Sequence, residues 1–171
     1  MRILICGDRY WNDISTIILL LKYIHLSEKV DYKDMVIIEG EASGADKLGK
    51  EAALMLGVPK ENILEYPAPW GEIEGKPAYQ IGTRGNGSRF WKAAGPVRNR
   101  KMLNEGNPDI VLAFHRDITV SYGTKDMVTI AMKAGKKVII QGVRGNRPVV
   151  YNNGEQLTLF TEETFKNEII R

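Results

Sequence analysis

Cysteine is almost absent from this chain of 171 residues, which contains only Cys6. A lone cysteine forms no disulfide within the chain and no cysteine-based metal site, and such usage is typical of a reducing cytoplasm. Histidine is also scarce, with two residues, and no His, Cys and Asp cluster has metal-ligand spacing. We therefore expect a cytoplasmic protein without a metal or another cofactor.

Long hydrophobic runs and strong net charge are missing as well. The longest apolar run, residues 17–21, is far short of the roughly 18 residues that span a bilayer, so we expect no membrane segment. Residues 1 and 2 lead directly into an apolar segment, so we expect no signal peptide. The net charge of +3 is too small to indicate nucleic-acid binding by itself. The composition, 43% hydrophobic and 26% charged, excludes a disordered chain.

Short apolar segments alternate with helical patterns along most of the chain. The patterns predict strands at 2–6, 35–39, 63–66, 109–114 and 137–140, and helices at 13–25, 45–56, 97–104 and 123–134. This alternation predicts right-handed βαβ crossovers. The expected fold class is therefore α/β, a Rossmann-like parallel sheet with helices on both faces.

Two segments depart from this alternation. Residues 67–95 are rich in proline and glycine and predict a long surface loop, with an insertion at about 71–90. Asn153-Gly154 predicts a β-hairpin between residues 148–152 and 156–160, and a short helix is expected after Thr161. We expect a domain over residues 1–145 and a hairpin-helix appendage over 146–171.

Four polar or glycine-rich patches are expected at the carboxyl ends of the strands: residues 7–10, residues 39–46, the stretch up to 98–100, and residues 121–126. In open parallel sheets, ligands bind beyond the carboxyl ends of the strands. Amides at a helix N-terminus, as expected at Gly44 and Gly123, favour a phosphate. Each patch also has a structural interpretation, with Gly40 and Gly44 as turn glycines and Ser43 or Ser121 as helix caps. Neither the P-loop nor the dinucleotide fingerprint is present, which disfavours an ATPase and a nicotinamide dehydrogenase.

Basic residues indicate an anionic ligand, and aromatic residues nearby could contact a base. Residues 84–101 contain six basic residues and no acidic one, and Arg98 among them suits bidentate contact with an oxyanion. Trp70, Phe90 and Trp91 either stack on a base or hold the loop against the core. The acidic candidates are Asp8, Glu39, Asp46 and Asp126, the last of which is expected in the first turn of its helix. We expect His25 in the core and a structural role for His115.

Five segments, taken in order, resemble the SLOG superfamily and most closely its YspA-related branch. They are CGDRYWND (6–13), EGEASGAD (39–46), PAPW (67–70), KAAGPVRNRKM (92–102) and SYGTKDM (121–127). The resemblance implies a Rossmann-like fold and a pocket for a nucleotide or a nucleotide-derived ligand. Relatives include DprA and the Lonely Guy phosphoribohydrolases, which cleave the N-glycosidic bond of nucleoside monophosphates.

The resemblance also implies site residues. By position, Arg98 and Asp126 look like an arginine and a glutamate that act together in the phosphoribohydrolases. The chain departs from that pattern, because Val120 and Ser121 replace two loop glycines and aspartate replaces the glutamate. These departures affect the prediction of catalysis more than the prediction of binding.

Three functions follow as hypotheses. The first is a sensor or sequestering protein that binds a nucleotide or an ADP-ribose-like molecule. The second is a nucleoside monophosphate N-glycosidase with Arg98, Asp126 and Glu39 as catalytic residues, and the third is DprA-like binding of single-stranded DNA. A homo-oligomer is also expected. The predicted ligand-binding residues are Gly7, Asp8, Arg9, Tyr10, Gly40, Ser43, Gly44, Ala45, Asp46, Trp70, Arg98, Asn99, Ser121, Gly123 and Thr124.

Overall fold

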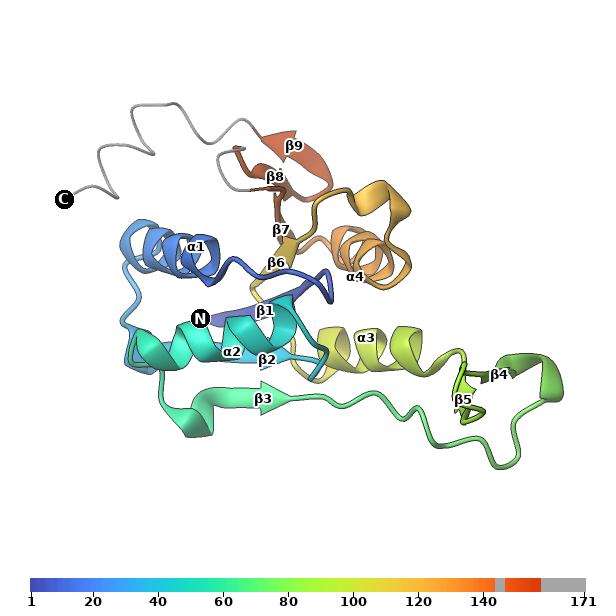
Figure 1. Cartoon of the computed structure of the whole chain (residues 1–171). Coiled ribbons are helices and arrows are strands. Elements are labelled where there is room, and N and C mark those ends of the chain that lie inside the picture. The colour runs from blue at the N-terminus through green and yellow to red at the C-terminus, as the bar shows by residue number, and fades with distance from the viewer. Residues whose placement is uncertain (144–146, 158–171) are drawn as a thin grey trace.

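A seven-stranded sheet organises the molecule, which we describe from a computed structural model over residues 1–143 and 147–157 (Figure 1). The strands lie in the order β3-β2-β1-β6-β7-β8-β9. Their bounds are β1 Arg2–Gly7, β2 Val36–Glu39, β3 Ile63–Glu65, β6 Ile110–Phe114, β7 Lys137–Gln141, β8 Val149–Asn152 and β9 Glu155–Leu157. The first five pair in parallel, while β8 and β9 are antiparallel additions.

In the part of the chain that the structure describes, four α-helices cover the two faces of the sheet, as predicted. They are α1 Ile14–Ser27, α2 Ala45–Met55, α3 Ala94–Asn104 and α4 Tyr122–Lys133. Because β1 is buried on both faces, its alternate residues belong to two hydrophobic cores, one on each face of the sheet. Ile3 and Ile5 pack with α1 and α2, whereas Leu4 and Cys6 pack with α3 and α4. This arrangement confirms the α/β, Rossmann-like expectation.

The helices that connect the strands lie on one face of the sheet on the β1 side and on the other face on the β6 side. Helices α1 and α2 follow β1 and β2 on one face, and α3 and α4 flank β6 on the other. Strands β1 and β6 are neighbours whose register runs from Ile3↔Ile110 to Gly7↔Phe114. Their carboxyl ends therefore form the topological switch point, where open α/β sheets bind ligands.

An arm, residues 71–92, projects beyond the N-terminus of α3 (Figure 1). The sequence predicts only a surface loop there, but the structure has two short antiparallel strands, β4 Ile81–Thr83 and β5 Arg89–Trp91. The edge-on contact of Trp70 with Phe90, with ring centroids 6.1 Å apart, holds the arm against the preceding segment. Neither core cluster includes a residue of the arm.

Several local expectations require correction. Asp126 lies beyond the first turn of α4, because the helix begins at Tyr122. His25 is half-buried rather than core, since its ring stacks on Tyr32 with centroids 4.3 Å apart. Ser43 does not cap α2, whose N-cap is Gly44 without a side-chain bond.

The predicted C-terminal hairpin is confirmed by β8 and β9, while the helix expected after Thr161 lies outside the described residues. Within residues 1–143 and 147–157, no helix is long and apolar enough to cross a membrane.

Candidate functional site

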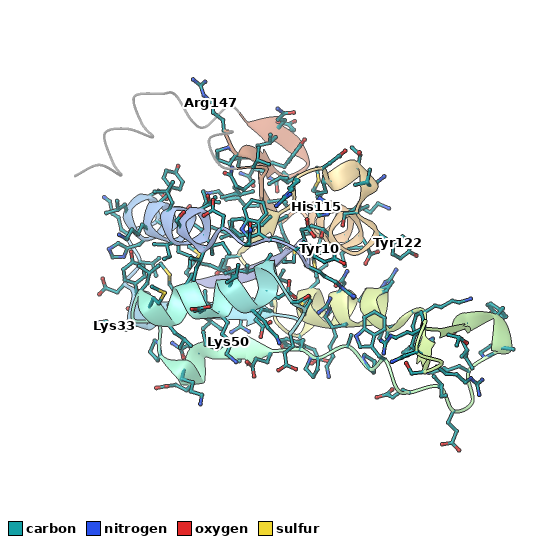
Figure 2. The ribbon with its side chains drawn as sticks, in the orientation of Figure 1. Tyr10, Lys33, Lys50, His115, Tyr122 and Arg147 are labelled. Atoms are coloured by element: carbon teal, nitrogen blue, oxygen red, sulfur yellow. The ribbon has the colours of Figure 1, made fainter. Side chains whose placement is uncertain are left out.

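A cleft of about 350 Å³ opens at the switch point, and we call it the switch-point cleft. This volume lies at the lower end of the range of small-molecule sites, roughly 300–1,000 Å³. Figure 2 shows Tyr10, His115 and Tyr122 gathered beside α4, whereas Lys33 lies on the opposite side of the molecule. The lining residues are Cys6, Gly7, Asp8, Arg9, Tyr10, Ala42, Asp46, Trp70, Lys92, Gly95, Pro96, Arg98, Asn99, His115, Ser121, Tyr122, Gly123 and Thr124.

Two glycines allow the backbone to pack closely in and beside this cleft. The Asp8 amide donates to the Phe114 carbonyl at 2.8 Å, and a Cβ on Gly7 would lie 2.1 Å from the same oxygen. Gly44 adopts φ +75°, where a side chain is strained, and a Cβ there would lie 2.2 Å from the Asp8 carbonyl. The loop after β1 therefore packs directly against the start of α2.

Arg98 is a mostly buried cation at the base of the cleft, with 13% of its side chain exposed. Its guanidinium donates to the Gly40 carbonyl and lies 3.6 Å from an Asp46 carboxylate oxygen. Gly40 is a glycine because Arg98 approaches it closely, since a Cβ would lie 1.6 Å from Nη1. Gly40 lacks the positive φ of a turn glycine, so that interpretation of it is wrong.

Asp46 is buried on the first turn of α2 and pairs with this guanidinium. Burial raises the pKa of Asp46 to about 6, although Arg98 and the Gly40 amide, which donates to the carboxylate at 3.1 Å, act in the opposite direction. Asp46 therefore titrates closer to neutrality than an ordinary aspartate.

Helix α4 directs its N-terminus at the cleft. Ser121 caps the helix, as predicted, and accepts a hydrogen bond from the Thr124 amide at 3.1 Å. The first amides of any helix lack intrahelical partners, and those of Tyr122 and Gly123 precede the capped one. A Cβ on Gly123 would meet nothing within 4 Å. Tyr122 and Gly123 both line the cleft, and the helix dipole there favours an anion.

Buried Asn99 connects α3 to α4 below this opening. Its side-chain amide donates to the Gly123 carbonyl at 3.1 Å and to Asp126 at 2.9 Å, while its oxygen accepts from Arg98 Nε at 3.2 Å. Asp126 does not line the cleft. It holds Asn99, and through Asn99 it fixes the position of Arg98 relative to Gly123.

Aromatic rings and exposed cations form the rim. Arg9 lies over the Trp70 ring, 5.7 Å from its centroid, and both residues line the cleft. Tyr10 and Tyr122 are 84% and 82% exposed, so their rings are free to stack on a planar group. Lys92, which is also exposed, adds a cation from the end of the arm.

The structure places most of the predicted residues in or beside this cleft. Arg98 and Gly123 share it, while Gly44 and Ala45 shape the start of α2 without lining it. Gly40 and Ser43 line an adjoining hollow. Glu39 faces a different hollow, beside Lys47 and Leu54 of α2.

Sequence reasoning missed Lys92, His115 and Tyr122 as lining residues. His115 immediately follows β6, so the rule that ligands bind at strand ends was a signal for it. The backbone amide of Asp117 donates to His115 Nδ1 at 3.1 Å, which holds the ring in place. Within the described residues, no group of three or more His, Cys, Asp or Glu could hold a metal ion.

Comparisons with known proteins agree with this architecture. Residues 1–71 match the family described as "YspA, cpYpsA-related SLOG family", which covers the segments around Asp8 and Asp46. The X-ray structure of DNA processing protein A (DprA) from Streptococcus pneumoniae is similar with a TM-score of 0.52 and 18% identity, over 85% of this chain.

The chain spans about half, 51%, of that DprA chain. No curated protein sequence matches this chain. At 18% identity, the DprA similarity bears on the fold alone. The resemblance to the YspA-related SLOG family is confirmed over residues 1–71, on a DprA-like, Rossmann-like fold.

Proposed function

We propose that this chain binds a nucleotide or a nucleotide-derived, ADP-ribose-like metabolite in the switch-point cleft, as a sensor or sequestering protein. The observation that carries the proposal is the meeting of three features in one cavity: the open N-terminus of α4 at Gly123, the cations Arg9 and Lys92, and the aromatic rim. The family match over residues 1–71 supports a nucleotide-related ligand.

Each feature suits one part of a nucleotide. The amides at Gly123 and the guanidinium of Arg9 suit a phosphate, which accepts several charge-assisted hydrogen bonds. The rings of Trp70, Tyr10 and Tyr122 suit a base, because aromatic side chains stack on any base. Arg98 lines the same cleft and has guanidinium N–H groups besides the one that bonds Gly40, although its charge is partly offset by Asp46.

Gly123→Val tests this proposal with little risk to the fold. The new Cβ meets no protein atom within 4 Å, and the larger side chain lies at the part of the cleft that we assign to the phosphate. We expect wild-type protein to bind a nucleotide from a panel of mono-, di- and cyclic nucleotides in calorimetry, and the variant to bind at least about 10-fold more weakly. Gly85→Val is the matched control, because its Cβ is equally free and Gly85 lies on the arm. Absence of binding by the wild type at millimolar nucleotide would contradict the proposal.

Hydrolysis of a nucleotide N-glycosidic bond is the second candidate, and Asp46 is the observation that favours it. Its carboxyl lines the cleft beside Arg98 and has a pKa near 6, which suits proton transfer. Asp8 is the other carboxylate in the cleft, whereas Glu39 and Asp126 lie outside it. Chromatography of a nucleoside monophosphate incubated with the protein should then show free base, with loss of turnover in Asp8→Asn or Asp46→Asn. Absence of free base with the wild type would remove this candidate.

A DNA-binding role has weaker support. The exposed basic residues Arg84 and Arg89 on the arm favour contact with a polyanion. Single-stranded DNA therefore belongs in the binding panel, at low and high salt.

A further inference from the structure

A hollow of about 480 Å³ lies between helix α2 and the carboxyl ends of β2 and β3, and we call it the α2–β3 hollow. Its volume falls within the range of small-molecule sites, roughly 300–1,000 Å³. Among the described residues, none lines both this hollow and the switch-point cleft. The hollow is therefore separate from the proposed nucleotide site.

The sheet places two carboxyl groups side by side in this hollow. Glu39 and Glu65 are register partners in adjacent parallel strands, which lie about 4.8 Å apart, and both residues line the hollow. Like charges in such a cross-strand pair repel each other. The Lys50 ammonium of α2 pairs with the Glu65 carboxylate. Glu39 forms no ion pair with any residue in the described part of the chain.

Glu39 is a buried carboxyl group with one unused oxygen. The residue is only 1% exposed, and its Oε2 accepts a hydrogen bond from the Glu41 amide at 2.6 Å. Among the described residues, no fully buried side-chain oxygen lacks a hydrogen-bond partner. Oε1, which has none, therefore opens into the hollow. Because an uncompensated buried carboxylate is costly, this position suits a ligand with a positive charge and an N–H donor.

The other end of the hollow is apolar. Leu54 and Met55 of α2 line it and are 39% and 66% exposed. Helix α2 begins just after β2, so Lys47, in its first turn, lies near the carboxyl groups. Leu54 and Met55 lie roughly 10–12 Å farther along the helix axis, at 1.5 Å per residue. The hollow therefore fits a ligand with one cationic end and an apolar body.

We propose that the α2–β3 hollow binds a small aliphatic amine, whose ammonium group bonds to Glu39 and Glu41 and whose alkyl chain lies against Leu54 and Met55. An ammonium group has three N–H donors, so it can bond Oε1 of Glu39 and the Glu41 carboxylate together. Hydrogen bonds between two charged groups are about twice as strong as neutral ones. Burial of the alkyl chain adds a contribution for each methylene group.

Three ligands separate the two contributions in ¹⁵N-¹H correlation spectra of labelled protein at about pH 8. Hexylamine carries the charge and the chain, methylamine carries the charge alone, and 1-hexanol carries the chain alone. We expect hexylamine to shift the amides of Glu39, Glu41 and Lys47 and to leave Gly123 of the switch-point cleft unchanged. Methylamine and 1-hexanol should each bind at least about 10-fold more weakly, because each lacks one contribution.

Glu39→Gln tests the carboxylate itself. The glutamine oxygen can still accept the bond from the Glu41 amide, but the variant should bind hexylamine at least about 10-fold more weakly at pH 8. Glu72→Gln, at an exposed position on the arm, is the matched control and should bind as wild type does.

The pH dependence of the wild type gives a test that needs no variant. Burial raises the pKa of Glu39 to about 7, with further increases from Asp46, Glu65 and Glu41 that outweigh the bond from the Glu41 amide. Alkylamines and the neighbouring Lys50 stay protonated up to about pH 10. The affinity for hexylamine should therefore rise several-fold between about pH 6 and about pH 8, as Glu39 ionises.

Three results would overturn the proposal. They are the absence of shifts at the amides of the hollow with hexylamine at tens of millimolar, an affinity for 1-hexanol equal to that for hexylamine, and a hexylamine affinity that does not change with pH. Each result leaves nucleotide binding in the switch-point cleft untouched, because the two sites share no lining residue among those described.

Discussion

At the scale of single residues, Gly40 determines where Arg98 can lie. A Cβ at this position would lie 1.6 Å from the guanidinium, so Gly40→Ala must displace Arg98 from both the Gly40 carbonyl and Asp46. Separating a buried pair leaves a poorly compensated charge, and we expect a loss of about 1–3 kcal/mol in the free energy of unfolding. Urea denaturation measures this loss. Gly123→Ala, where the Cβ is free, should unfold no more easily than wild type, and an equal effect at both positions would contradict the account.

Glu39 should make stability depend on pH. Burial raises its pKa from 4.5 to about 7, so the folded protein retains a proton in this interval that the unfolded chain releases. The contribution of this carboxyl to stability is therefore fully present below pH 4.5 and is lost as the pH rises through about 7. Glutamine does not titrate, so Glu39→Gln removes that loss. In mildly alkaline buffer, the free energy of unfolding of the variant should be about 2 kcal/mol higher than that of wild type.

Urea unfolding at acidic and alkaline pH measures this difference. The Glu41 amide donates to a Glu39 carboxylate oxygen at 2.6 Å, and the glutamine oxygen can accept the same bond. Glu61→Gln, at an exposed position, is the control and should follow the wild-type profile. A constant offset between Glu39→Gln and wild type at every pH would show that Glu39 does not titrate as described.

At the scale of elements, the arm can be separated from the core. Its rings pack on cations of the arm itself, with Lys76 Nζ 4.0 Å from the Trp91 centroid and the Arg84 guanidinium 5.1 Å from that of Phe90. The Trp91 amide donates to the Trp70 carbonyl at 2.9 Å, so the two ends of the arm are adjacent. Replacing residues 72–90 with a short Gly-Ser linker should therefore leave the midpoint of thermal unfolding within a few degrees of wild type.

The same excision should weaken nucleotide binding, because Trp70 loses its contact with Phe90 at the rim of the cleft. We expect a decrease of about 3- to 10-fold in affinity, which is the size of effect expected when one aromatic ring no longer packs against another. Circular dichroism and calorimetry on one preparation measure both effects. A large loss of thermal stability would show that the arm belongs to the core after all.

The elements also show what the sequence could and could not predict. The apolar runs of β1 and β6 and the helical repeats between them are strong, local signals, so the parallel sheet and its helices were predictable. The arm was not, because β4 and β5 have three residues each and depend on contacts between rings and cations rather than on an alternating pattern.

At the scale of the whole molecule, the strand-end rule pointed to the cleft but not to its internal pairing. It led us to expect Asp8, Arg98 and Gly123 at one edge of the sheet, and all three line the switch-point cleft, Arg98 from helix α3. It could not predict that Arg98 pairs with Asp46 or that Glu39 faces α2, since these depend on side-chain direction and on the register between distant segments.

The central claim is that the amides at the start of α4 and the arginines beside them hold the phosphate of a nucleotide. A titration of isotopically labelled protein with AMP, followed by ¹⁵N-¹H correlation spectra, tests it most directly. We expect the largest shifts at the amides of Tyr122 and Gly123 and at the Arg9 and Arg98 side chains, and no effect at exposed residues of α2 such as Lys47. Shifts confined to other surfaces, with Gly123 unchanged at saturating AMP, would contradict it.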